Sequence, residues 1–239
     1  NAHPLFGGID FKTAPGGAHA FPRCKISVKK EIVHLGIDPE KLTTKNTGQH
    51  LTPEQTHELF LNPPQDFVVL DGRNSYEAAI GKFVGAITPD IRYFRQFPEY
   101  VDQNLDQFKD KTVFMYCTGG IRCERASAYL NEKGVAKKVY QVEGGIHRYV
   151  EKYPNGFFRG KNYVFDQRIT VKVNDDVIAK CLNCSAASDE YFNCLNALCN
   201  KHFVSCQSCW DIFEKTCSQK CKILLQEKKT PERIPFQKI

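Results

Sequence analysis

The 239-residue sequence contains no apolar run that approaches the ~18 residues of a membrane-spanning helix, and no secretory signal at its start. We therefore expect no membrane partner. Its excess of one charge sign is also small, since 33 Lys and Arg stand against 27 Asp and Glu. The net charge of +6 permits a partner with phosphates, but a solvated surface explains it equally well. The first residue is Asn rather than Met, so we expect a preceding segment to be missing.

The sequence also lacks the even number of cysteines that a disulfide framework needs. The chain has 11 cysteines, and eight of them lie between Cys181 and Cys221. Because CxxC spacing without an export signal is typical of metal binding in a reducing compartment, we place the protein in the cytoplasm or the nucleus. A disulfide cluster is the alternative, and it would need an oxidising compartment.

Apolar runs and helical patterns alternate along the middle of the chain. The runs 67–71, 113–116 and 138–142 are typical of strands, and Thr52-Pro53 is a typical helix start. Helical patterns cover 75–80, 97–108 and 125–133. Buried strands separated by helices predict an α/β fold, with a parallel sheet flanked by helices. Ligands on such sheets bind beyond the carboxyl ends of the strands.

The flanking segments suggest smaller units. Segments 8–13 and 24–35 have strand-like patterns, and 154–178 shows a strand-like alternation. The basic residues and prolines after 221 are typical of a mobile tail. The expected division is a partial N-terminal unit at 1–36, a central domain at 37–155, a connector at 156–180, a cysteine module at 181–221 and a basic tail at 222–239.

One stretch points directly to chemistry. Cys117-Thr118-Gly119-Gly120-Ile121-Arg122-Cys123-Glu124 joins the apolar run 113–116 to a helical pattern. The glycines let backbone amides curl around the cysteine, and amides at a helix start attract an anion. A thiol held there loses its proton easily and becomes a nucleophile. An inert buried thiol is the alternative, and the glycine pair and Arg122 argue against it.

Several segments resemble the rhodanese domain. They are Asp71-Gly72-Arg73, the Gly81 to Ala86 segment, the Cys117 loop, and Val142-Glu143-Gly144-Gly145-Ile146. The longer stretch Tyr116–Leu130 is similar to the tRNA uridine hydroxylase (TrhO) family and its eukaryotic thiosulfate sulfurtransferase/rhodanese-like relatives. The likeness covers about residues 20–221. It implies a rhodanese-like fold and a ferredoxin-like domain that ends within 1–36.

The resemblance implies that Cys117 is the catalytic residue, cradled by Thr118, Gly119, Gly120, Ile121 and Arg122. Our main hypothesis is a sulfurtransferase, in which Cys117 takes a persulfide sulfur from a small donor such as thiosulfate or another persulfide. The first alternative is hydroxylation of the wobble uridine of tRNA, which makes tRNA the partner. The second alternative is a non-catalytic module that binds an anion and a protein.

Five further residues are weighed as members of the site, and the first of them, Arg122, could also be an ordinary surface arginine. We expect the charge of Arg122 to stabilise the Cys117 thiolate from the rim of the loop and to contact an anionic donor. Cys123 either attacks an oxidised or persulfidated Cys117 to form a disulfide, or packs inside the helix. Asp71 and Arg73 are either active-site groups or, as we favour, a structural pair. We do not expect His147 to act as a general base.

The eight clustered cysteines are spaced to hold two zinc ions in closed tetrahedral shells. Metal would then stabilise a segment that has too few apolar residues to fold alone. Two groupings remain open, because the cysteines can bind sequentially as first four and last four, or in an interleaved manner. The interleaved order is RING-like and allows a protein-binding role. The candidate ligands are Cys181, Cys184, Cys194, Cys199, Cys206, Cys209, Cys217 and Cys221.

Basic residues between the Cys117 domain and the cysteine module are candidates for contacts with an RNA backbone. Aromatic residues nearby are candidates for stacking on bases. Taken singly, these are solvated charges and core rings, and only the family resemblance favours RNA. The residues concerned are Lys137, Lys138, Arg148, Arg159, Lys161, Arg168 and Lys172, with Phe157, Phe158 and Tyr163.

Overall fold

The computed structural model describes residues 26–166 and 168–233, together with Pro4 and Gly7. Its centre is a four-stranded sheet in the order β1-β5-β4-β2, and every pairing in it is parallel. The strands are β1 (Gln49–Leu51), β2 (Phe67–Asp71), β4 (Thr112–Tyr116) and β5 (Lys138–Val142). The predicted parallel α/β architecture is therefore confirmed.

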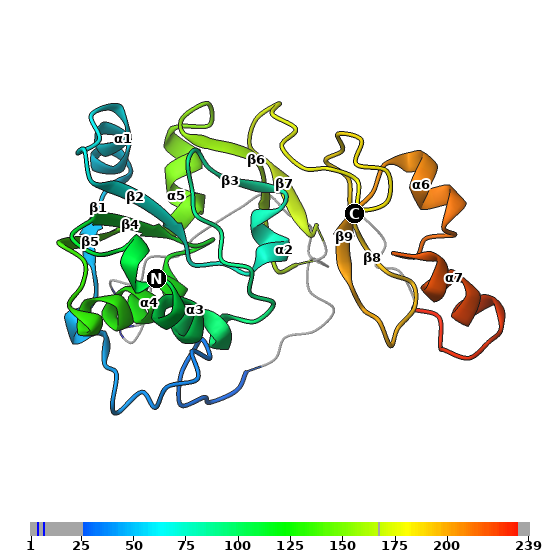
Figure 1. The fold of residues 1–239 in the computed structure, drawn as a ribbon, viewed down its shortest axis with the longest axis horizontal. Coiled ribbons are helices and arrows are strands. Elements are labelled where there is room, and N and C mark those ends of the chain that lie inside the picture. Colours follow the sequence, from blue (N-terminus) through cyan, green and yellow to red (C-terminus); the bar gives the residue numbers. More distant parts are fainter. Residues whose placement is uncertain (1–3, 5–6, 8–25, 167, 234–239) are drawn as a thin grey trace.

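Helices cover both faces of this sheet. Figure 1 shows α1 (Pro53–Leu61) and α5 (Gly145–Lys152) above it, and α3 (Phe97–Gln103) and α4 (Ile121–Lys133) below it. Strand β4 is buried along its whole length, as its apolar sequence requires. Three short 3₁₀ turns complete the domain: η2 (Thr44–Asn46), η3 (Phe94–Gln96) and η4 (Leu105–Gln107). The predicted helix at 97–108 is thus divided between α3 and η4.

The helix signals in the sequence act as predicted. Thr52 caps α1, with its hydroxyl accepting from the Gln55 amide at 3.2 Å while the Gln55 side chain accepts from the Thr52 amide at 2.9 Å. Pro53 occupies the first turn, where its missing N–H is harmless. Helix α4 ends at Gly134, whose φ of +65° is the left-handed conformation that favours glycine. The predicted helix at 75–80 is the shorter α2 (Ser75–Ala78).

A second, antiparallel sheet joins the central domain to the rest of the chain. It consists of β3 (Gly81–Phe83), β6 (Phe158–Tyr163) and β7 (Thr170–Lys172) in that order. The predicted connector, with its alternating pattern, contains β6 and β7. Figure 1 shows the cysteine module beyond this sheet. That module contains the hairpin β8 (Tyr191–Asn193) and β9 (His202–Val204), then α6 (Gln207–Ile212) and α7 (Gln219–Gln226).

Two predictions about the flanks need correction. Residues 26–35 form no strand, and segment 8–13 lies outside the described residues. The predicted mobile tail is wrong for residues 222–233. Ser218 caps α7 by accepting from the Cys221 amide at 3.4 Å, and so starts a helix that continues to Gln226. The chain then returns to the module, where the Pro231 carbonyl accepts from the Ala197 amide at 3.1 Å.

Within the described part of the chain, no helix combines the length and the apolarity that crossing a bilayer requires.

Candidate active site

Cys117 lies immediately after β4, at the carboxyl end of the parallel sheet. Its side chain is buried, with only 2% exposed. The Gly120 amide donates a hydrogen bond to the Cys117 sulfur at 3.2 Å. Gly120 has a φ of +91°, so it reverses the chain just before α4 begins at Ile121. The loop therefore curls around the sulfur and directs backbone N–H groups at it.

The start of α5 holds this loop from the other side. The Ile146 amide donates to the Cys117 carbonyl at 2.9 Å, and the His147 amide donates to the Thr118 carbonyl at 3.1 Å. Gly145 makes the close approach feasible, because a Cβ there would lie 2.5 Å from the Cys117 carbonyl oxygen. Its φ of +68° also favours glycine. The segment 142–146 carried part of the family resemblance, but the reason for its glycines becomes visible only in the structure.

The surroundings lower the pKa of Cys117 from its ordinary 9.0 to about 5. The largest cause is a hydrogen bond from the Cys123 thiol. Burial opposes it, while the charge of Arg122 and the amides of Cys123 and Arg122 add to it. Burial, followed by the adjacent Cys117 sulfur, raises the pKa of Cys123 well above its usual range. At neutral pH the pair is therefore a Cys117 thiolate beside a protonated Cys123.

Arg122 is clamped by a residue that the sequence analysis missed. Its guanidinium donates to the two carboxylate oxygens of Glu77 at 2.6 and 2.7 Å, and Glu77 is fully buried. A third, longer contact of 3.4 Å reaches the Thr118 hydroxyl. The charge of Arg122 thus lies near the Cys117 sulfur, but both terminal nitrogens already have partners. A direct contact between Arg122 and an anionic donor stays a prediction.

The structural interpretation of Asp71 and Arg73 is confirmed. The two side chains are fully buried and joined by a 2.7 Å ion pair. Tyr116 donates to Asp71 at 2.7 Å, and Arg73 donates to the Gly81 carbonyl at 2.6 Å. This network links the ends of β2 and β4 to the start of β3. His147, in turn, lies 3.2 Å from Glu151 on the same helix.

The eight clustered cysteines come together in two groups of four. One group is Cys181, Cys184, Cys206 and Cys209, and the other is Cys194, Cys199, Cys217 and Cys221. Within each group the sulfur atoms lie within 4.8 Å of one another. Of the two groupings that the sequence left open, the structure shows the interleaved one. None of the ten described cysteines forms a disulfide.

The sulfur spacing fits a tetrahedral metal site. Four ligands about 2.3 Å from a zinc ion would lie about 3.8 Å apart. The Cys184 and Cys206 sulfurs are 3.6 Å apart, and the Cys217 sulfur is 3.6 Å from Cys199 and 3.8 Å from Cys221. Both groups are therefore potential metal sites with closed shells of four thiolates.

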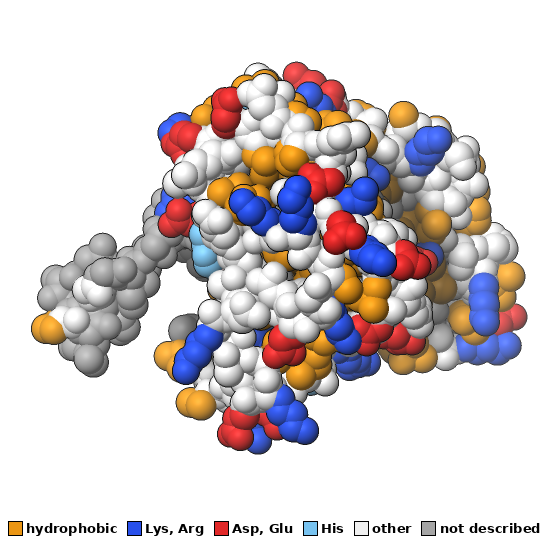
Figure 2. Space-filling model, turned by 60° about the vertical axis from the view of Figure 1, so that its left-hand side comes forward, with side chains coloured by type: hydrophobic (Ala, Val, Ile, Leu, Met, Phe, Trp, Pro, Cys, Tyr) orange, Lys and Arg blue, Asp and Glu red, His pale blue; other side chains and the backbone are white. Residues whose placement is uncertain are grey.

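Most of the candidate RNA-contact residues already have partners within the protein, and contact with RNA stays a prediction. Phe158 and Tyr163 are buried core residues, so their rings are closed to a base, and the partly buried Phe157 stacks on Phe60. Figure 2 shows basic and acidic side chains interspersed over one face of the molecule. Six of the seven candidate cations are paired with carboxylates: Lys137 with Asp66, Arg148 with Glu151, Arg159 with Asp176, Lys161 with Asp189, Arg168 with Asp166 and Lys172 with Asp175.

Comparisons with known proteins cover both halves of the chain. Residues 52–152 match the family described as Rhodanese-like domain, and residues 159–222 match the one described as Rhodanase C-terminal. A Cytophaga hutchinsonii protein named tRNA uridine(34) hydroxylase is 41% identical over 98% of this chain and 73% of its own length. A Chlamydia felis protein of the same name is 42% identical over 91% of this chain and 67% of its own length.

Among solved structures, the rhodanese-like domain of an Anabaena protein is similar with a TM-score of 0.39 and 17% identity. The similarity covers 48% of this chain and 80% of that domain.

Proposed function

Because the chain belongs to the tRNA uridine(34) hydroxylase family of rhodanese-domain enzymes, we propose that it hydroxylates uridine 34 of a tRNA with Cys117 as the catalytic residue. The observation that carries this proposal is the extent of the likeness. Identity of 41–42% extends over 91–98% of the chain, and so includes the cysteine module as well as the rhodanese domain.

This proposal replaces sulfur transfer, our main hypothesis from the sequence. A rhodanese domain alone does not separate the two activities, since both place a cysteine in the same loop. The relatives favour hydroxylation, because they match this chain through both domains and carry that name. Sulfur transfer therefore becomes an outcome that the experiment has to exclude.

The residues of the loop supply a stabilised thiolate. The Gly120 amide and the Cys123 thiol donate to the Cys117 sulfur, and the Glu77 clamp keeps the Arg122 charge nearby. Such a preorganised group of donors stabilises negative charge without reorganising during the reaction. Hydroxylation replaces a C–H hydrogen of the base by a hydroxyl group, which is a two-electron oxidation. The reaction therefore also requires an oxygen-donating co-substrate, either a peroxide, which leaves as an alcohol or water, or dioxygen together with a two-electron reductant that converts the second oxygen atom to water.

The two cysteine groups would each hold one structural zinc ion in this proposal. Four-thiolate shells leave no open position for a substrate, so their contribution is to the fold. The apolar core of the module supports this view, because it is small and consists largely of the cysteines with Phe203, Phe192 and Trp210. We place the rhodanese domain at 37–155 and the connector at 156–180, and extend the cysteine module from 181 to at least 233.

The test uses an extract of cells that lack the protein, so that any small co-substrate is present. Purified wild-type protein should add one oxygen atom to uridine 34, detected by mass spectrometry of tRNA nucleosides. Cys117→Ser should add none, because a hydroxyl is a far poorer nucleophile than a thiolate. Thiocyanate formation from thiosulfate and cyanide, with uridine 34 unchanged, would instead restore sulfur transfer as the function.

A further inference from the structure

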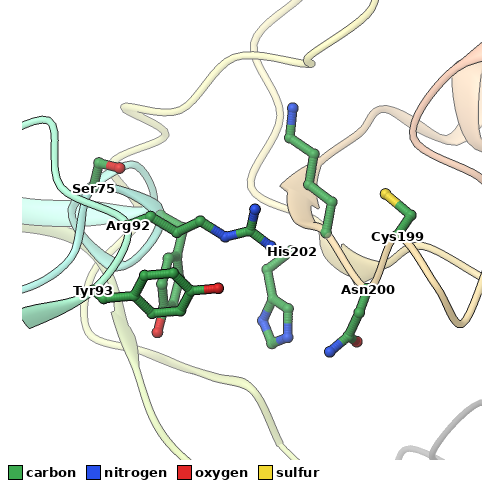
Figure 3. A pocket seen from close by; sticks show the side chains of 8 residues that line it. Ser75, Arg92, Tyr93, Cys199, Asn200 and His202 are labelled. Carbon is green, nitrogen blue, oxygen red and sulfur yellow. The ribbon is translucent and has the colours of Figure 1, made fainter.

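A pocket of about 500 Å³ lies between the rhodanese domain and the cysteine module. Figure 3 shows Ser75, Arg92 and Tyr93 on one side of it and His202 on the other, with Arg92 extending toward His202. Tyr76 also lines the pocket. The volume falls within the range of roughly 300–1,000 Å³ that is typical of ligand pockets.

Aromatic contacts fix the two walls relative to each other. The Tyr163 hydroxyl lies 2.8 Å from His202 Nδ1, and the Tyr191 hydroxyl donates to the Tyr76 carbonyl at 2.7 Å. The rings of Tyr76 and Tyr163 pack edge to face at 5.4 Å. Because these partly buried hydrogen bonds and the ring contact join residues of the two walls, the pocket is a preformed feature of the fold.

The lining of the pocket is positively charged. It contains Arg92 and Lys201 and no carboxylate. Among the residues that the structure describes, neither of these cations, nor the adjacent Arg95, forms an ion pair with an acidic side chain. This distinguishes them from the paired cations of the connector. The pocket is therefore suited to an anionic ligand.

Tyr93 adds an accessible aromatic surface beside these charges. Its side chain is 48% exposed, and the guanidinium carbons of Arg92 and Arg95 lie 5.5 and 4.9 Å from its ring centre. A ring flanked by guanidinium groups can stack on a nucleobase while the cations contact its phosphates. An acidic peptide would interact with the cations of the pocket but would not need the ring of Tyr93.

Helix α2 connects the pocket to the Cys117 loop. Tyr76 lines the pocket, and the next residue, Glu77, holds Arg122. A second connection runs through Phe165, which is 60% exposed, lies 5.6 Å over Arg122 and packs edge-on against Tyr163 at 5.2 Å. A ligand in the pocket would therefore lie next to the residues that support the catalytic loop.

We propose that this pocket binds a nucleotide of the substrate tRNA that neighbours uridine 34, with its base on Tyr93 and its phosphates on Arg92 and Lys201. This inference rests on the proposed function and specifies how the RNA is held. Binding of the neighbouring nucleotide at the junction of the two domains leaves the uridine itself to reach the Cys117 loop. It also gives the cysteine module a role, because that module supplies one wall.

The test compares variants with the same change of charge. Arg92→Gln/Lys201→Gln removes both pocket cations, while Lys45→Gln/Lys109→Gln removes two exposed lysines outside the pocket lining. The pocket variant should bind tRNA at least tenfold more weakly at low salt and show a salt slope smaller by about 1.5 to 2. The control should bind as wild type does. Tyr93→Ala should weaken binding about tenfold or more, and Tyr93→Phe should restore most of it. Metal content and circular dichroism establish that each variant is folded.

The outcomes separate the pocket from the activity. If the pocket and control variants bind tRNA equally and the wild type hydroxylates uridine 34, the proposed role of the pocket is refuted and the proposed function stands. If tRNA binding depends on the pocket but the wild type does not hydroxylate uridine 34, the proposed function is refuted and the proposed role of the pocket stands. A wild-type protein that binds no tRNA contradicts both. A poly-glutamate peptide that competes as well as single-stranded RNA of equal charge would overturn the assignment of Tyr93.

Discussion

At the level of single residues, the site depends on two cysteines, six positions apart, whose pKa values are shifted in opposite directions. The protonated Cys123 thiol donates to the Cys117 sulfur, which lowers the pKa of Cys117, while burial and then the same hydrogen bond raise the pKa of Cys123. The same hydrogen bond weakens the case for Cys123 as an attacking nucleophile, because the thiolate form is the reactive one. In the unmodified state, Cys123 acts as a donor to Cys117.

The acidity of Cys117 gives the first prediction. Its thiol should titrate near pH 5, so it should be a thiolate across pH 6–8. Because the folded-state pKa lies below that of a free thiol, ionised Cys117 stabilises the fold at high pH, and this contribution is lost as the pH falls toward 5. The ¹³Cβ chemical shift of Cys117, identified by its absence in Cys117→Ser, reports the titration. A midpoint near 9 would show that the loop does not activate the thiol. Cys123→Ala should raise the midpoint.

The second prediction concerns the clamp on Arg122. Glu77→Gln leaves a buried guanidinium without its counter-charge and should lower the free energy of unfolding by about 3 kcal/mol. Cys117 should remain a thiolate, since removing a nearby negative charge does not disfavour its anion. Urea unfolding and the Cys117 titration measure the two effects. Asp175→Asn, which breaks an exposed ion pair with Lys172, should leave the unfolding midpoint unchanged. Equal midpoints for both variants would refute the role of the clamp.

At the scale of elements, the site is formed by β4, the loop, α4 and the start of α5. Gly145 is where α5 meets the loop, and it gives the third prediction. Gly145→Ala should lower activity about 100-fold, because its Cβ would displace the Cys117 backbone. Gly134→Ala is the matched control, with a φ of +65° and open space around it. It should cost about 1–2 kcal/mol of stability and leave activity intact. Similar activities for the two variants would contradict this account of α5.

Local sequence signals predicted most of these elements, and long-range pairing explains what they missed. The capping pattern of Thr52 and Gln55 and the apolar run of β4 lie within single segments, so their consequences could be predicted directly. Glu77 meets Arg122 across 45 positions, and no local pattern identifies such a pair. Tail residues 222–233 were misjudged on composition, although Ser218 was a detectable helix start.

At the scale of the whole molecule, the fold combines a domain with a conventional core and a module held by cysteines. The fourth prediction tests how those cysteines are grouped. Elemental analysis should find about two zinc ions per chain in the wild type. Cys184→Ser/Cys206→Ser alters one of the observed groups, so one zinc should remain. Under the sequential grouping the same change would affect both sites. Complete loss of metal from this variant, with the rhodanese domain still folded, would therefore contradict the observed grouping.

The distribution of charge gives the fifth prediction. Although the chain carries a net charge of +6, most candidate cations of the connector are paired with carboxylates, whereas Arg92 and Lys201 of the interdomain pocket and the adjacent Arg95 form no ion pair within the described part of the chain. If the adjacent Arg95 also contacts a phosphate beside those held by Arg92 and Lys201, the logarithm of the tRNA affinity should fall with the logarithm of the salt concentration with a slope of about −2 to −3. A slope beyond about −6 would show that the paired cations also bind phosphates. Equilibrium binding at several salt concentrations measures it.

Whether Cys117 is the catalytic residue for hydroxylation of uridine 34 is decided by the mass of nucleoside 34 in tRNA from living cells. Cells that lack the protein would receive either the wild type or Cys117→Ser at equal expression. We predict that the wild type restores a uridine heavier by one oxygen atom and that Cys117→Ser leaves the nucleoside unmodified. Equal hydroxylation with both proteins would show that Cys117 is not the catalytic residue, and an unmodified uridine 34 with the wild type would contradict the proposed function.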